Sequence, residues 1–127
     1  MKRGEIDWLL VSLLVVMTTL LVLPGKDLPS YGNTPNFIWE NGLHACGFGL
    51  LALLIFRKML SGSSQNLAWK FFWTMIIVAV YAAGTELAQR WVPGRTSSAI
   101  DALVDVTGGL AGLSIAMFWQ WQRQRKV

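Results

Sequence analysis

The residues of this sequence that could bind a ligand or transfer a proton stand near the ends of long apolar runs. They are Glu40, His44, Glu86, Gln89, Arg95, Asp101 and Asp105. Carboxylates and an imidazole can act as general acids or bases or can hold a cation, and a guanidinium can bind an anion. An ionisable group in the middle of a membrane helix costs about 3 kcal/mol or more, so such groups normally face one another or a wet cavity.

The spacing of these residues predicts that they share helix faces. Glu40 and His44 are four residues apart, and Glu86 and Gln89 are three apart. Residues at these spacings are neighbours on a helix surface. Arg95 follows in a Val-Pro-Gly-Arg turn and is the obvious counter-charge for the carboxylates.

Asp101, Asp105, Gly108 and Gly112 fall on one stripe of a helix, because each residue advances by about 100°. The two glycines would let another helix approach closely, and the two carboxylates would then point into the same interface. We therefore expect the polar residues to converge on one pocket. A simpler role for Asp101 is that of a first-turn residue, favoured by the helix dipole.

Four apolar spans must position these residues, at about 6–23, 39–57, 68–89 and 98–119. Spans of this length can cross a hydrocarbon core of about 30 Å. The chain has 127 residues, of which 54% are hydrophobic and 14% charged, and a soluble domain of this size would need more polar surface. We predict an all-α fold, an integral membrane four-helix bundle that forms a single transmembrane domain over residues 1–127.

The basic residues predict the orientation of the bundle. With a cytoplasmic N-terminus, eight of the eleven Lys and Arg residues lie in the cytoplasm, as the positive-inside rule favours. The eight are Lys2, Arg3, Arg57, Lys58, Lys70, Arg123, Arg125 and Lys126. Both termini are then cytoplasmic, residues 26–38 form an outer loop, and the pocket faces the extracytoplasmic side of the plasma membrane. Because the basic residues stand in short groups between apolar runs, a nucleic-acid partner is not expected.

The sequence predicts neither a metal nor another cofactor. The carboxylates and His44 could ligate a cation, but their spacing matches no dedicated metal signature. Cys46 is the only cysteine, which excludes an intrachain disulfide and a thiolate cage. It stands in an apolar run beside Gly47, so we expect it to pack within the bundle.

The order of these motifs resembles the VanZ-like family. The resemblance covers residues 39–112 and rests on the following residues: His44, Glu86-Leu-Ala-Gln89, Pro93-Gly94-Arg95, Asp101, Asp105, Gly108 and Gly112. The chain departs from the family pattern at two places. Glu40-Asn41 stands where the family often has Asp-Lys, and Asp105 stands where it usually has Asn. These departures remove a positive charge from the pocket and add a negative one.

The resemblance implies a small multi-helix membrane protein of the cell envelope. The founding member of the family is associated with lowered sensitivity to the glycopeptide antibiotic teicoplanin. We therefore expect a protein that binds an amphiphilic or lipid-like molecule in the outer leaflet. Its polar head would lie at Arg95 and His44 and its acyl part along the last two spans. The other predicted partner is a second copy of the chain, through Gly108 and Gly112.

The alternative is a membrane enzyme that acts on a lipid or cell-wall precursor. His44 or Glu86 would then be the general acid or base, Arg95 would stabilise an anion, and Asp101 with Asp105 would hold His44 or a divalent cation. A transporter is a weaker alternative, because no polar residues continue from this cluster into the cytoplasmic half of the spans.

Overall fold

The computed structural model describes residues 3–22, 36–62, 66–93 and 99–125. These residues form four α-helices: α1 (Arg3–Val22), α2 (Asn36–Leu60), α3 (Leu67–Gln89) and α4 (Ala99–Gln124). Each helix contains a stretch long and apolar enough to cross a membrane. The all-helical fold with four candidate spans that the sequence predicted is therefore confirmed.

The helices extend past the apolar runs from which the spans were predicted. α2 already includes residues 36–38, which the sequence analysis assigned to a loop, and α4 continues to Gln124 beyond the predicted limit of 119. At the C-terminal ends of α2 and α4 the difference arises because hydropathy marks only the apolar part of a helix, whereas backbone hydrogen bonding continues into polar flanks. Arg57 and Lys58 in the last turn of α2 suit such an extension, since cations are stabilised at a helix C-terminus.

α3 has a defined signal at each end. Before its first turn the side chain of Asn66 accepts a hydrogen bond from the backbone N–H of Ala68 at 3.1 Å, as an N-cap residue does. After its last turn the N–H of Val92 donates to the carbonyl of Gln89 at 3.0 Å, and Pro93 follows. Gly94 and Arg95, the rest of the predicted turn, lie outside the described residues.

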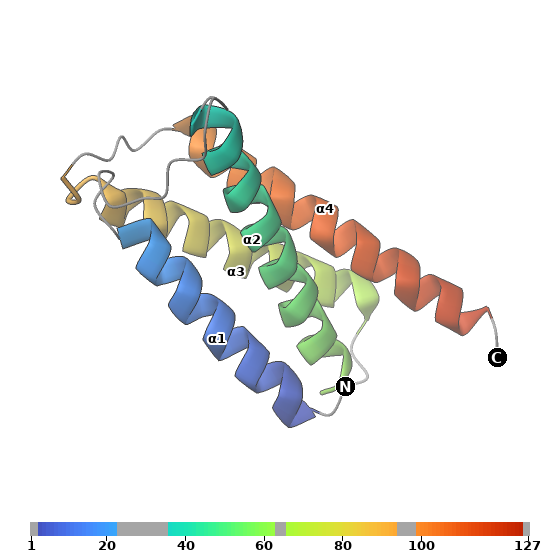
Figure 1. Ribbon diagram of the computed structural model, residues 1–127. Helices are drawn as coiled ribbons and strands as arrows, with labels where there is room; N and C mark the ends of the chain where they lie inside the picture. Colours follow the sequence, from blue (N-terminus) through green and yellow to red (C-terminus); the bar gives the residue numbers. More distant parts are fainter. Residues whose placement is uncertain (1–2, 23–35, 63–65, 94–98, 126–127) are drawn as a thin grey trace.

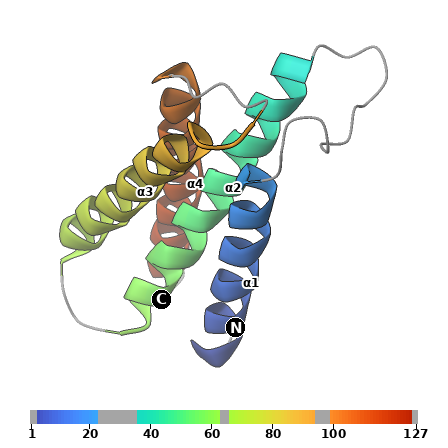
Figure 2. The same ribbon diagram turned by 90° about the vertical axis from the view of Figure 1, so that its left-hand side faces the viewer.

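α2 is the central helix of the bundle. It contacts each of the other three helices and packs most extensively against α4, whereas α1 packs against α2 and α3 (Figure 1). α2 and α4 run in one direction, and α1 and α3 run in the other (Figures 1 and 2). The start of α1 and the end of α4 consequently lie at the same end of the bundle.

The two ends of the bundle differ in charge, and we call them the basic end and the polar end. The basic end carries Arg57 and Lys58 of α2 and Arg123 and Arg125 near the end of α4. The polar end is the opposite one, where α3 ends and α4 begins, and it carries those residues of the predicted pocket that the structure describes.

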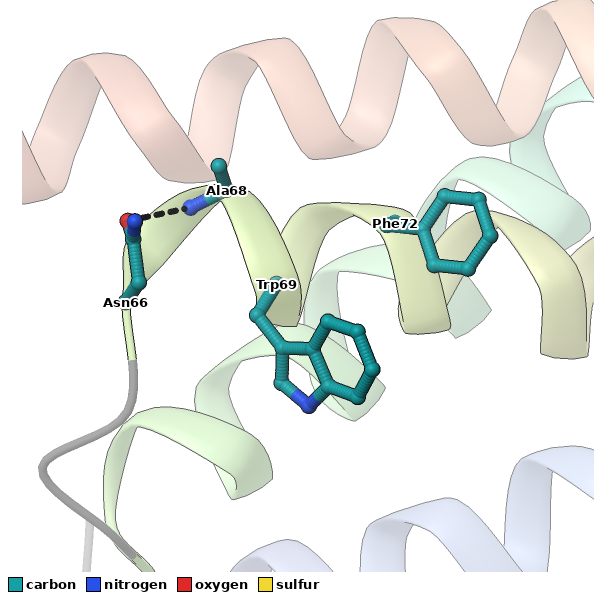
Figure 3. A pocket seen from close by; sticks show the side chains of 4 residues that line it. All are labelled: Asn66, Ala68, Trp69 and Phe72. Carbon is teal, nitrogen blue, oxygen red and sulfur yellow. Dashed lines mark hydrogen bonds between the residues drawn. The ribbon is translucent and has the colours of Figure 1, made fainter.

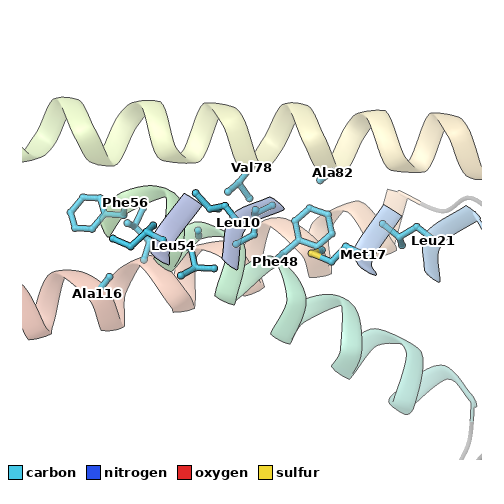
Figure 4. Packing of buried hydrophobic residues seen from close by; sticks show 13 residues of the cluster. Leu10, Met17, Leu21, Phe48, Leu54, Phe56, Val78, Ala82 and Ala116 are labelled. Carbon is cyan, nitrogen blue, oxygen red and sulfur yellow. The ribbon is translucent and has the colours of Figure 1, made fainter. Parts of the chain in front are cut away.

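Apolar side chains fill the bundle and also cover its outside. α1 contributes Leu10, Met17 and Leu21 to a core that includes the fully buried Phe48 and Val78 (Figure 4). Large apolar side chains are also exposed on all four helices, for example Trp8 (75% exposed), Leu43 (52%), Val80 (67%) and Leu103 (64%). A continuous apolar exterior of this kind favours lipid as the surrounding solvent. The structure thus fits a multi-pass membrane protein.

The position of Cys46 differs from the one expected from the sequence. Its side chain is exposed on the surface of α2, whereas we expected it to pack inside the bundle. The neighbouring Gly47 instead faces α1, where a Cβ atom would lie 3.1 Å from the methyl carbon of Met17. Because lipid is as apolar as the interior, an apolar run does not distinguish inward-facing from outward-facing positions.

Candidate functional site

The backbones of α2 and α4 touch at two glycines. A Cβ atom at Gly108 would collide with the backbone of Ala45, and one at Gly112 would collide with the backbone of Gly49. The close approach that the glycine stripe predicted is therefore present, and the partner helix is α2. Ala45 and Gly49 are themselves four residues apart, a small-xxx-small pair that our sequence analysis missed although its spacing was visible.

This register brings His44 and Asp105 together. The Nδ1 atom of His44 lies 2.9 Å from the Oδ1 atom of Asp105. Asp105 is fully buried, and the imidazole is largely buried with 14% of its side chain exposed. An imidazole protonated at Nδ1 donates a hydrogen bond to the carboxylate, which fixes the ring and leaves Nε2 as its other functional atom.

α3 adds three buried polar residues at this end, Thr85, Glu86 and Gln89. The contact between Gly109 of α4 and Val78 of α3 defines the register of these two helices: a Cβ atom at Gly109 would lie 2.7 Å from Cγ1 of Val78. Because the two helices are antiparallel, Glu86 lies level with Asp101, about one turn nearer the polar end than Asp105. Asp101 itself is half-buried.

Two buried polar atoms at this end have no hydrogen-bond partner among the described residues. They are the Oδ2 atom of Asp105 and the Nε2 atom of Gln89. A buried donor or acceptor without a partner costs about 1–3 kcal/mol, and most such groups in proteins are satisfied. The polar end therefore offers one acceptor and one donor to a molecule that could enter it.

The structure places five of the seven predicted site residues. His44 and Asp105 are in contact, and Glu86, Gln89 and Asp101 lie at the same end of the bundle on α3 and α4. Arg95 lies outside the described residues. Glu40 belongs to α2, but the described structure does not include its side chain. Gly108 and Gly112 are buried against α2, so a homo-oligomer through these glycines would have to displace that helix.

The described parts of the chain contain no cluster of potential metal ligands. There, no three His, Cys, Asp or Glu side chains lie close enough together to hold a metal ion. The pair formed by His44 and Asp105 is thus a two-residue contact in this region.

The sequence analysis missed two buried polar residues toward the basic end. Lys70 and Thr74 of α3 are buried, and the hydroxyl of Thr74 donates to the carbonyl of Lys70 at 2.8 Å. Lys70 had been read only as a cytoplasmic topology signal. The buried face of α3 between Thr74 and Thr85 is apolar, formed by Val78 and Ala82, so the polar residues at the two ends are not continuous along this helix.

A hollow in the surface lies away from the polar end, at the start of α3. It is lined by Asn66, Ala68, Trp69 and Phe72, and no ionisable side chain is among them (Figure 3). The aromatic rings of Trp69 and Phe72 stack, with their centroids 6.3 Å apart. This hollow is open and offers no acid–base chemistry, so the buried cluster at the polar end remains the better candidate site.

Comparison with known proteins supports the resemblance seen in the sequence. No curated protein and no solved structure matches the chain. The sequence model of the VanZ/LLP1 family matches residues 7–120, which include all seven predicted site residues and also Gly108 and Gly112. Because this match covers nearly the whole chain, the protein belongs to the VanZ/LLP1 family.

Proposed function

We propose that this protein binds an amphiphilic, lipid-like molecule whose polar head enters the cluster at the polar end. The observation that carries the proposal is the pair of buried atoms without partners, Oδ2 of Asp105 and Nε2 of Gln89. They lie at the same end of the bundle as the 2.9 Å hydrogen bond between His44 and Asp105. A buried site that is already ordered and still offers a donor and an acceptor suits ligand binding.

The chemistry of the cluster favours a head group with hydroxyl or amide groups. Such a group both donates and accepts, so it could donate to Asp105 and accept from Gln89. The acyl part would lie along α3 and α4, where Val80 and Leu103 present apolar surface to the outside. Arg95 and Glu40 remain proposed members of the site, with Arg95 as counter-charge to the carboxylates.

Family membership supports a role in the cell envelope. The founding member is associated with lowered sensitivity to teicoplanin, and that antibiotic carries a fatty acyl tail. We therefore propose the plasma membrane as the location, the extracytoplasmic side for the site, and glycopeptide resistance as a consequence of binding. The gathering of Arg57, Lys58, Arg123 and Arg125 at the other end supports this orientation.

The test is the lipid that copurifies with the protein in mild detergent, measured by native mass spectrometry. We expect Asp105→Asn and Gln89→Leu to lower the amount of bound amphiphile. Asp7→Asn is the matched control, because it makes the same chemical change in α1 near the basic end. If all three variants retain the amphiphile equally, the site at the polar end is wrong.

The same hydrogen bond favours a second candidate function, acid–base catalysis on a lipid or cell-wall precursor. A carboxylate bound to Nδ1 orients an imidazole and stabilises its protonated form, so Nε2 could move a proton. Glu86 and Asp101 are the other candidates for proton transfer. An enzyme predicts that His44→Gln abolishes turnover of a lipid-linked substrate while the protein still retains it, whereas a binding protein predicts loss of retention alone.

A further inference from the structure

A second site lies at the basic end, in a crevice between α2 and α4. Six of the described residues line it: Arg57, Leu60, Ala116, Trp119, Gln120 and Arg123. These six include two guanidinium groups, one from each helix, and no carboxylate. The sequence analysis had treated both arginines only as topology signals.

Lys58 and Arg125, the neighbouring basic residues, do not line the crevice. The Nζ atom of Lys58 lies 2.6 Å from Oδ1 of Asp7 on α1. The guanidinium of Arg125 lies over the ring of Trp121, 3.7 Å from its centroid, in a cation–π contact. A basic side chain can therefore lie near the basic end without lining the crevice.

The size of the crevice limits what could enter. Its volume is about 30 Å³, which admits two or three oxygen-sized atoms, because a water molecule needs about 10–15 Å³. An anionic oxygen suits this space, since a guanidinium presents a fork of N–H donors to phosphate or carboxylate oxygens. The rest of a larger ligand would stay outside.

The apolar part of the lining points to a lipid as the source of that anion. Ala116 is buried and Leu60 half-buried, while the ring of Trp119 is 52% exposed at the outer surface of α4. Tryptophan is enriched at the membrane–water interface, where its ring meets the glycerol and upper acyl regions of lipids. A free anion would use the guanidinium groups but would gain nothing from these apolar neighbours.

We propose that this crevice binds the phosphate group of an anionic phospholipid. Arg57 and Arg123 hold the phosphate oxygens from two helices, and Gln120 donates a hydrogen bond to the same head group. Trp119 packs against the adjoining glycerol and acyl region. This lipid would join α2 to α4 at the basic end, opposite the contact of His44 with Asp105, and its binding does not depend on the function proposed for the polar end.

The test is a titration of the purified full chain in detergent with phosphatidylglycerol, followed by native mass spectrometry. Phosphatidylcholine is the zwitterionic control, and excess inorganic phosphate is the competitor. We expect a clear preference for phosphatidylglycerol that inorganic phosphate does not remove. Arg123→Gln should lower its affinity about tenfold, as expected for the loss of one hydrogen bond between charged groups.

Arg125→Gln is the matched control, because it removes the same charge two residues further along the chain, outside the crevice. Its affinity for phosphatidylglycerol should stay close to that of the unmodified protein. Arg123 and Arg125 are both exposed, so neither substitution should prevent folding. Arg57→Gln should reproduce the loss from the other helix, and Arg57→Lys with Arg123→Lys should retain part of the affinity.

Three results would overturn the proposal. Equal losses for Arg123→Gln and Arg125→Gln would indicate diffuse electrostatic attraction without a site. Equal binding of phosphatidylglycerol and phosphatidylcholine would remove the preference for an anionic lipid. Displacement of the lipid by inorganic phosphate at the same concentration would identify the free anion as the ligand.

Discussion

His44 of α2 and Asp105 of α4 are joined by a hydrogen bond of 2.9 Å directly beside the place where the two helix backbones touch. The hydrogen bond depends on this close approach of the two backbones. The small residues Ala45 and Gly108 bring the helices so close that His44, directly before Ala45, can reach Asp105, about one turn before Gly108. In this fold the glycine stripe therefore positions the chemistry as well as packing the helices.

The glycines of α4 can be tested against a glycine that has open space. Gly112→Ala should destabilise the protein by about 1–3 kcal/mol, because the new methyl group would collide with the backbone of Gly49. Gly84→Ala is the control: nothing lies within 4 Å of a Cβ atom at Gly84, and alanine favours the helix by up to about 1 kcal/mol. Thermal unfolding in detergent measures both. A Gly112→Ala protein as stable as Gly84→Ala would contradict the close packing of α2 on α4.

The contact between His44 and Asp105 should be energetically coupled. A double-mutant cycle with His44→Leu and Asp105→Leu, measured by equilibrium unfolding, should give a coupling energy of about 1 kcal/mol. Each single substitution leaves a buried polar partner behind, so the double substitution should cost less than the sum of the two single substitutions. Strictly additive effects would mean that the two side chains do not interact in the folded protein.

The ion pair between Lys58 and Asp7 should contribute little by comparison. Its atoms are 2.6 Å apart but are not aligned as a hydrogen bond, and both side chains are nearly half exposed. Asp7→Asn should change the free energy of unfolding by less than about 1 kcal/mol, and added salt should reduce even that effect. Unfolding at low and high salt measures it. A salt-independent loss of several kcal/mol would show that this pair is buried in the membrane-embedded protein.

The orientation can be tested because the chain has a single cysteine, Cys46. In a Cys46→Ala background, Pro93→Cys introduces an exposed thiol near the polar end and Gly62→Cys one near the basic end. A membrane-impermeant maleimide should label Pro93→Cys in intact cells and Gly62→Cys only after permeabilisation. This follows from the excess of Lys and Arg predicted for the cytoplasmic side. The reverse labelling pattern would place the candidate site on the cytoplasmic side.

The sequence by itself determined the helical class, the four spans and the stripe of Asp105, Gly108 and Gly112. These features depend on local properties, namely the length of apolar runs and the periodicity of a helix, so they survive without any knowledge of neighbours. The resemblance to the VanZ-like family was also readable from the order of motifs, and the match over residues 7–120 confirmed it.

Only the tertiary structure decided which side chains meet. In the structure Gly108 and Gly112 of α4 pack against α2, and His44 contacts Asp105. Lys70 is buried and Cys46 is exposed. In a soluble helix the apolar face marks the interior, but lipid accepts apolar residues on every face, so hydropathy alone does not show how a membrane helix is rotated. The rotation is set by close packing of small residues against a particular neighbour, which is a property of two helices and not of either sequence segment alone.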